Sequence, residues 1–265
     1  MINYKLSGTT ALIDADILIY SACFFKLDNK DSLDKNRLLS IRKSVVDSLV
    51  SNINTLLNPD HMLLFLSCSR VDNFRKRYNI DYKAGRPDKP EFFTEIKEYI
   101  NTAYRAITVP TLEADDLIGI YANKENEYCE DSIICTIDKD LQQLDGEYFH
   151  LRKKEQWTIS KTEANKNLFR QILTGDATDN IKGLYHIGVK KAEKYIEEHC
   201  KGDYSVKRLV EVTTQKYFEH LKNSGMDQET ILNIYRCNAN QIFILRKEGQ
   251  SFDNWIMDQI QKEGS

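Results

Sequence analysis

Short apolar runs alternate with longer amphipathic segments over the first 160 residues, and this alternation constrains the fold more than any other feature. The runs at residues 11–13, 62–66, 107–109 and 133–137 are each bounded by polar residues, which predicts buried strands. Residues 38–57, 91–104 and 112–122 carry apolar side chains at three- and four-residue spacing, which predicts helices. Strands that alternate with helices require crossover connections, so we predict an α/β fold with a mostly parallel sheet flanked by helices.

The last third of the chain has a different pattern. The strand signal fades beyond residue 160, and residues 160–173, 189–199 and 228–245 are predicted to be helices. We therefore expect two parts, which are an α/β core over residues 1–160 and a C-terminal helical module over residues 161–265. Residues 200–265 carry no motif that indicates a function.

Composition limits the class of protein. The 265 residues carry a formal net charge of −3 and are 41% hydrophobic, as in ordinary globular proteins. The six cysteines include no Cys-x-x-Cys pair, which indicates reduced thiols rather than a disulfide framework. The N-terminus lacks a signal-peptide pattern, and no apolar stretch reaches the roughly 18 residues of a membrane helix. We expect a soluble cytoplasmic protein without a membrane partner.

Acidic residues gather where the apolar runs end. Two follow the first run, three open the helix after residues 107–109, and two follow the run that ends at residue 137; they are Asp14, Asp16, Glu113, Asp115, Asp116, Asp138 and Asp140. Because ligands of open parallel sheets bind at the carboxyl ends of the strands, these groups can converge on one place.

Crowded carboxylates repel each other, and a divalent cation removes that penalty. Ligand sets made only of oxygen suit Mg²⁺ or Mn²⁺, and two such ions about 4 Å apart can activate water and stabilise an in-line phosphoryl displacement. Each cluster also has a structural explanation. Asp14 can cap a strand end, residues 113–116 can complement a helix dipole, and Asp138 and Asp140 can be turn residues.

Residues 173–192 give the most specific signal in the chain. Gly183 and Gly188 bracket a predicted tight turn between two helices, where glycine permits positive φ and close backbone approach. The second helix begins near Gly188, so its N–H groups can hold a phosphate. A site that binds the sugar-phosphate backbone needs positive charge but does not need to recognise bases. Here the positive charge comes from Lys190, Lys191 and Lys194. A plain helix-turn-helix corner explains the glycines but not the lysines.

Five short motifs in order resemble the flap endonuclease-like 5′ nuclease family, and most of all its free-standing bacteriophage 5′–3′ exonucleases. The resemblance covers residues 11–196. It is carried by Ile13-Asp14-Ala15-Asp16, Asp81-Tyr82-Lys83-Ala84-Gly85-Arg86, Glu113-Ala114-Asp115-Asp116, Thr136-Ile137-Asp138-Lys139-Asp140 and Gly175-Asp176-Ala177-Thr178-Asp179-Asn180.

The resemblance implies roles for the matching acids. A first metal group would contain Asp14, Glu113, Asp115 and Asp138, and a second would contain Asp140, Asp176 and Asp179, with Asp116 as a further acidic position of the family. Residues 173–199 would contain the family's helix-three-turn-helix, which binds duplex DNA and usually K⁺. Two Mg²⁺ ions, for which Mn²⁺ can substitute, are the implied cofactors.

One position departs from the family pattern. The family usually carries an aspartate just after the second strand, where this chain has Ser67, Cys68 and Ser69. Asp72 is near in sequence, but its use would require a shifted loop. The departure affects the expected rate and metal preference more than the class of reaction.

A basic segment follows this departure. Residues 70–89 contain seven lysines and arginines against three aspartates, interleaved with aromatic residues, as in surfaces that follow a single strand. A solvated helix face is the ordinary alternative. The family places its arch here, at residues 70–105, which implies DNA contacts for Arg75, Lys76 and Arg77. Lys83 and Arg86 would neutralise charge on the scissile phosphate, and Tyr82 would stack on the nucleotide at the cut.

The predicted function is therefore a two-metal 5′–3′ exonuclease and 5′-flap endonuclease acting on DNA, expected to be a monomer in the cytoplasm, of the host cell if the chain is phage-encoded. Two alternatives remain open. A DNA-structure-binding protein with weakened or lost cleavage is suggested by the missing aspartate near Cys68. A PIN-like ribonuclease would share the core but would not need the helical hairpin.

Overall fold

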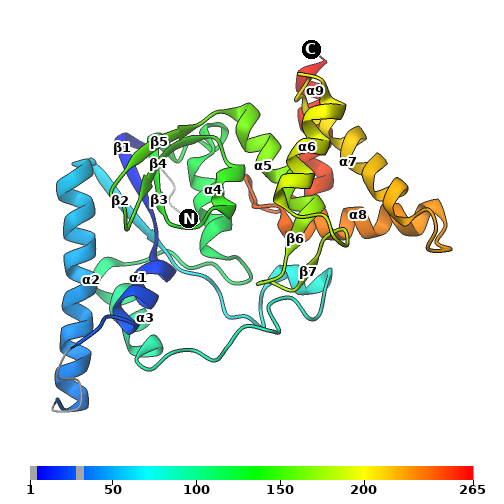
Figure 1. Cartoon of the computed structure of the whole chain (residues 1–265). Helices are drawn as coiled ribbons and strands as arrows, with labels where there is room; N and C mark the ends of the chain where they lie inside the picture. The colour runs from blue at the N-terminus through cyan, green and yellow to red at the C-terminus, as the bar shows by residue number, and fades with distance from the viewer. Residues whose placement is uncertain (1–4, 28–32, 265) are drawn as a thin grey trace. The chain divides into compact units, whose positions relative to one another are not determined.

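A computed structural model describes residues 5–27 and 33–264, which form two compact units (Figure 1). The first unit comprises the described parts of Met1–Asn73, Pro87–Asp138 and Gly146–Thr158. The second comprises Phe74–Arg86, Lys139–Asp145 and the described part of Ile159–Ser265.

The first unit is built on a five-stranded sheet in the order β2-β1-β3-β4-β5. The pairs β1–β2, β1–β3 and β3–β4 are parallel, which confirms the predicted mostly parallel α/β core. Residues 10–14 of β1 are all buried, as expected for a central parallel strand covered on both faces. The strands are β1 (Leu6–Asp14), β2 (His61–Phe65), β3 (Cys129–Thr136), β4 (Gly146–His150) and β5 (Gln156–Ile159).

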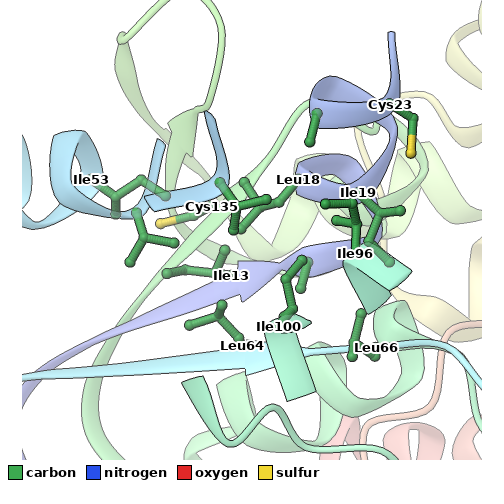
Figure 2. Packing of buried hydrophobic residues seen from close by; sticks show 14 of the residues in the cluster. Ile13, Leu18, Ile19, Cys23, Ile53, Leu64, Leu66, Ile96, Ile100 and Cys135 are labelled. Atoms are coloured by element: carbon green, nitrogen blue, oxygen red, sulfur yellow. The ribbon is translucent and has the colours of Figure 1, made fainter. Parts of the chain in front are cut away.

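Helices cover both faces of this sheet. Ile13 and Cys135 of one face pack with helices α1 (Ala15–Cys23), α2 (Lys35–Leu57) and α3 (Phe93–Tyr104) in a large apolar cluster (Figure 2). On the other face, Phe65 lies 5.0 Å from Tyr121 of α4 (Ala114–Ala122), measured between ring centroids. The short 3₁₀ helix η3 (Lys124–Asn126) follows α4. The predicted strand at residues 107–109 forms only a single parallel bridge, from Ile107 to Phe65.

The second unit is helical, as predicted for the C-terminal module. An aromatic cluster at its centre contains Phe169, Phe243, Phe252 and Trp255. Its elements are η2 (Phe74–Arg77), η4 (Asp140–Gln143), α5 (Lys161–Thr174), β6 (Gly175–Asp176), β7 (Ile181–Lys182), α6 (Val189–Cys200), α7 (Val206–Leu221), α8 (Gln228–Ile242) and α9 (Phe252–Glu263).

The unit boundaries differ from those expected for a core over residues 1–160 with an arch at 70–105. Phe74–Arg86 belongs to the helical unit, because the Arg75 guanidinium is buried there and donates to the carbonyls of Gln241 and Phe243, both at 2.8 Å. Phe93–Tyr104 is helix α3, whose Ile96 and Ile100 are fully buried in the core of the first unit. The range predicted for the arch is therefore divided between the two units.

All six cysteines are free thiols. Cys23, Cys129, Cys135 and Cys200 are buried, and burial raises the pKa of each of these thiols above its ordinary value. Cys68 and Cys237 are half-buried. Among the described residues, no helix combines the length and apolarity needed to cross a membrane.

Candidate active site

The carboxyl ends of β1, β2 and β3 lie at one edge of the sheet of the first unit. The register places Ile13 beside Leu64 on one side and Cys135 on the other, so the residues that follow these strands are neighbours. The Thr136 hydroxyl lies at the centre of this edge. It donates to Asp14 Oδ2 at 3.3 Å and accepts the Asp138 N–H at 2.9 Å. The structure therefore brings Asp14 and Asp138 together, although they are far apart in the sequence.

Asp14 is in an unfavourable electrostatic position. Its side chain is buried, and burial raises the pKa of this carboxyl well above its ordinary value, with further increases from the neighbouring carboxylates of Asp16 and Asp138. Hydrogen bonds from Thr136 and from the Ile17 backbone lower the pKa only in part. A cation at this edge would relieve both the repulsion and the cost of burial.

Helix α4 brings three further predicted acids to the first unit. Glu113 is the N-cap residue of α4, and Asp116 completes a capping box in which its Oδ2 accepts the Glu113 N–H at 3.1 Å. The Asp116 side chain is fully buried in this role, so the structure favours the capping interpretation over the predicted metal-ligand role of Asp116. Asp115, one position earlier, is only half-buried.

Ser67 connects the strand ends to α4, a role that the motifs alone did not indicate. Its N–H points to Asp16 Oδ1 at 3.5 Å, and its hydroxyl accepts the Ala114 N–H at 3.0 Å. Its carbonyl accepts a hydrogen bond from Lys97 Nζ at 2.7 Å. Ser67 therefore contacts residues of three separate segments of the first unit. Asp72 instead accepts the Ser69 hydroxyl at 2.6 Å.

Asp14 and Asp138 provide carboxylate oxygens that a divalent cation at this edge could use. Within residues 5–27 and 33–264, no three His, Cys, Asp or Glu side chains are arranged to hold a metal ion. Mg²⁺ commonly keeps several waters and takes only one or two carboxylates together with substrate phosphates. The oxygen donors of Asp14 and Asp138 match that mode of binding.

The second predicted acidic group lies in the helical unit. Asp140 Oδ1 accepts from the Gln171 side-chain amide at 2.9 Å, and Asp176 Oδ1 accepts the Thr178 N–H at 2.8 Å. Asp179 is buried, with 8% of the residue exposed, and its carboxylate contacts the cationic residues that the family resemblance placed at the scissile phosphate.

Three side chains of the basic segment bind the Asp179 carboxylate. The Tyr82 hydroxyl donates to Oδ2 at 3.0 Å, Lys83 Nζ lies 3.4 Å from the same oxygen, and the Arg86 guanidinium donates to Oδ1, with Nε at 2.9 Å. The Tyr82 side chain is buried, so its ring is not placed to stack on a nucleotide, contrary to the prediction. Its hydroxyl orients Asp179 instead.

The hairpin between α5 and α6 contains a two-residue antiparallel ribbon, which pairs Gly175 with Lys182 and Asp176 with Ile181. Gly183 is required by close backbone approach, because a Cβ there would lie 2.1 Å from the Thr174 carbonyl carbon. The prediction that Gly188 is also needed for positive φ or close backbone approach is wrong. Gly188 has a φ of −90° with open space beside its Cα, and it is the N-cap residue of α6.

The cationic side chains predicted to contact DNA divide into two kinds. Lys190, Lys191 and Lys194 are exposed at the start of α6, although Lys194 also pairs with Glu198 at 3.6 Å. Arg77 is exposed and lies over the rings of Phe74 and Tyr78, and Lys76 is half-buried. Arg75 cannot bind DNA as predicted, because its buried guanidinium is used by two backbone carbonyls of its own unit.

Comparison with known proteins identifies the family of this chain. Residues 9–170, more than half of the chain, match the family model described as the 5′–3′ exonuclease, N-terminal resolvase-like domain. DNA polymerase I of Rhizobium leguminosarum is 30% identical over 182 residues, which cover 62% of this chain and 18% of that protein. A 5′–3′ exonuclease of Buchnera aphidicola (from Acyrthosiphon pisum) is 26% identical over 208 residues, covering 72% of this chain and 70% of the relative.

The fold also has a solved counterpart. The T5 D15 protein, co-crystallised with metal ions, superposes with a TM-score of 0.61 at 16% identity and covers 96% of this chain and 98% of that chain. The chain spans less than a fifth of the polymerase relative but most of the exonuclease relative. Because this family model covers more than half of the chain, the chain belongs to the 5′–3′ exonuclease family.

Proposed function

We propose that this chain is a divalent-metal-dependent nuclease that hydrolyses phosphodiester bonds of DNA at a 5′ end or a 5′ flap. The observation that carries the proposal is the buried Asp14 carboxyl, held beside Asp16 and Asp138 at the ends of parallel strands. The repulsion between these carboxylates lowers the stability of the folded chain, and a cation bound at this edge of the sheet would offset it. The family supplies the class of reaction.

The residues divide the work as follows. Asp14, Asp115 and Asp138, with Glu113 at the N-cap of α4, would hold the first ion, and Asp140, Asp176 and Asp179 would hold the second. When bound, the ions supply an activated water and neutralise charge on the phosphate. Lys83 and Arg86 add fixed positive charge near the phosphate. The N-terminus of α6 and its lysines hold the sugar-phosphate backbone without reading bases.

The proposal is tested with a 5′-flap DNA and a matched RNA, each incubated with Mg²⁺ or with EDTA. We expect Mg²⁺-dependent DNA cleavage that leaves 5′-phosphate and 3′-hydroxyl ends. Binding without cleavage would instead identify a DNA-structure-binding protein, and preference for RNA a PIN-like ribonuclease. Asp138→Asn should lower the single-turnover rate about 100-fold, which corresponds to about 2.7 kcal/mol of barrier.

Asp131, on the strand that precedes Asp138, offers a matched control. Asp131 lies near the amino end of β3, opposite the carboxyl end that Asp138 follows; it is exposed and contacts Lys124 at 3.3 Å. Asp131→Asn removes the same charge as Asp138→Asn and should leave the rate within about twofold, because exposed ion pairs contribute little. Equal losses in the two variants would remove Asp138 from the site.

A variant of Lys83 can separate a role in catalysis from a role in DNA binding. Its Nζ lies beside Asp179, and in the reaction it would face the phosphate. Lys83→Ala should reduce the single-turnover rate about 100- to 1,000-fold, as loss of one preorganised charge-stabilising donor does elsewhere, with a much smaller change in DNA affinity. Similar losses in rate and in affinity would show that Lys83 only binds substrate.

Several finer features belong to the same proposal. We propose Mg²⁺ as the physiological ion, K⁺ at the hairpin of residues 173–199, a monomeric state and a cytoplasmic location. These rest on the family resemblance and on the sequence composition.

A further inference from the structure

The basic segment and the Asp179 loop are attached by their backbones as well as by their side chains. The Lys83 N–H donates to the Asp179 carbonyl at 3.0 Å. Two asparagine side chains add further hydrogen bonds. The Asn79 amide donates to the Asn180 carbonyl at 3.1 Å, and the Asn180 amide donates to the Asp81 carbonyl at 3.0 Å. All of these residues lie within the second unit.

The attachment neutralises Asp179 in advance. Both of its carboxylate oxygens accept hydrogen bonds or contact a cation, and the Lys83 and Asp179 side chains are each only 12% exposed. A divalent cation on this carboxylate would face two positive charges within a few ångströms. Like charges in a poorly solvated place repel strongly, so occupation by the metal and by the two side chains is mutually exclusive or nearly so.

The backbone of the attached segment is held in an unfavourable conformation. Lys83 has a φ of +60° and Asn180 a φ of +59°. Asparagine tolerates this left-handed region, but lysine rarely adopts it, and such residues persist only where surrounding contacts fix them. Loss of the contacts to Asp179 would therefore let Lys83 relax.

We propose that residues 79–86 form a counter-ion clamp on Asp179, which a divalent cation opens, so that metal binding itself releases Lys83 and Arg86 for the substrate phosphate. In this clamp Tyr82 is a positioning residue, because its hydroxyl orients the carboxylate without reaching substrate. The inference rests on the proposed function, which assigns Asp179 to the metal and the two cations to the phosphate.

The first test measures Mn²⁺ binding to the full chain by isothermal titration calorimetry, without DNA. Arg86→Gln removes one competitor for Asp179 and should tighten Mn²⁺ binding about five- to tenfold, the effect of losing one charge-assisted hydrogen bond. Lys76→Gln is the matched control. It removes the same charge from the same segment, but Lys76 Nζ contacts only the Ile80 carbonyl at 3.0 Å among the described residues, so affinity should change less than about twofold.

The second test follows opening directly by limited proteolysis. Trypsin does not cleave before proline, so the bond after Arg86 is resistant and the Lys83–Ala84 bond reports on the segment. Saturating Mn²⁺ should accelerate cleavage after Lys83 in the wild type. In Asp179→Asn, which weakens the clamp without metal, cleavage should be fast from the start and insensitive to Mn²⁺.

The outcomes separate the clamp from the function. Mn²⁺ binding with unchanged or weaker affinity in Arg86→Gln, or an equal gain in Lys76→Gln, overturns the clamp and leaves the nuclease proposal standing. Slower cleavage after Lys83 in the presence of Mn²⁺ also overturns the clamp. A wild-type chain that binds no Mn²⁺ and cuts no DNA overturns both.

Discussion

Replacement of Gly183 by alanine tests whether the hairpin depends on close backbone contact or on glycine flexibility. Gly183 follows β7 directly, and its Cα faces the end of α5. A Cβ at this position would lie 2.1 Å from the carbonyl carbon of Thr174 and 2.2 Å from its oxygen. These are backbone atoms, which cannot rotate away as a side chain can, so the ribbon must separate from the helix end.

The size of the effect follows from what must move. Separation weakens the hydrogen bond from the Leu184 N–H to the Leu173 carbonyl, now 2.9 Å long, and strains the Gly175–Lys182 pair. Overpacking typically costs about 1–3 kcal/mol, and a clash with rigid backbone belongs at the upper end. A loss of about 3 kcal/mol corresponds to a decrease in Tm of about 6–12 °C for a chain of this size.

The assay is thermal unfolding followed by circular dichroism, with Gly188→Ser as the control. Gly188 is an N-cap residue with open space beside it, and serine is a better N-cap than glycine, so this variant should melt at or slightly above the wild-type Tm. A Gly183→Ala variant that melts within about 2 °C of the wild type would refute the close-contact argument.

The remaining predictions concern charge. Since the pKa of Asp14 is raised in the folded state, stability is lost as pH rises from its ordinary value of 3.8 through the folded value. Asp14→Asn should therefore melt above the wild type at pH 7 in EDTA, with no difference below about pH 3.8, and Mg²⁺ should stabilise only the wild type; a lower-melting variant at pH 7 would contradict this. Arg75→Met removes the buried hydrogen bonds that Arg75 donates to the Gln241 and Phe243 carbonyls and should cost about 2 kcal/mol in urea unfolding. Arg77→Gln should instead leave stability unchanged and reduce the slope of log affinity against log salt by about 1 in DNA titrations. If Arg77→Gln lost as much stability as Arg75→Met, Arg77 would be a structural residue and not a DNA contact.

Much of the sheet was predictable because buried parallel strands are nearly continuous apolar runs. The runs at residues 11–13, 62–66 and 133–137 lie in or overlap β1, β2 and β3, and the acids after the first and third of these runs lie at one edge. β4 and β5 were missed, because Gly146–His150 mixes polar with aromatic residues and Gln156–Ile159 has only four residues. Residues 107–109 are apolar enough for a strand but contribute only one bridge.

The helical unit was predicted less completely. α7 and α9 were not predicted, although each begins at a serine N-cap, Ser205 or Ser251, whose hydroxyl accepts a backbone N–H three residues later. These caps mark where a helix can begin, but a serine N-cap alone is too common a feature to predict a helix. α8 ends at Ile242, before the predicted residue 245, because the chain turns to an extended conformation at Phe243.

The candidate site was predictable in its residue types but not in its pairings. The resemblance to the family indicated Lys83, Arg86 and Asp179 as site residues. The sequence alone does not show that Lys83 and Arg86 form ion pairs with Asp179. The sequence places Arg75 in a basic segment, which predicts a DNA contact. Its burial by two carbonyls could not be predicted, because they belong to residues more than 160 positions away. Ser67 was noticed only as a departure from the family, and its contacts to Asp16 and Ala114 emerge from the packing of α4.

The burial of most cysteines leaves one thiol near the acidic edge as a candidate for chemical labelling. Four of the six cysteines are buried with raised pKa values, and burial also raises the pKa of the half-buried Cys237. Because thiolates are the reactive form, these five should alkylate slowly. Cys68 is half-buried and directly follows Ser67 at the acidic edge. A fluorophore coupled there would place a reporter next to the proposed metal group without any engineered residue.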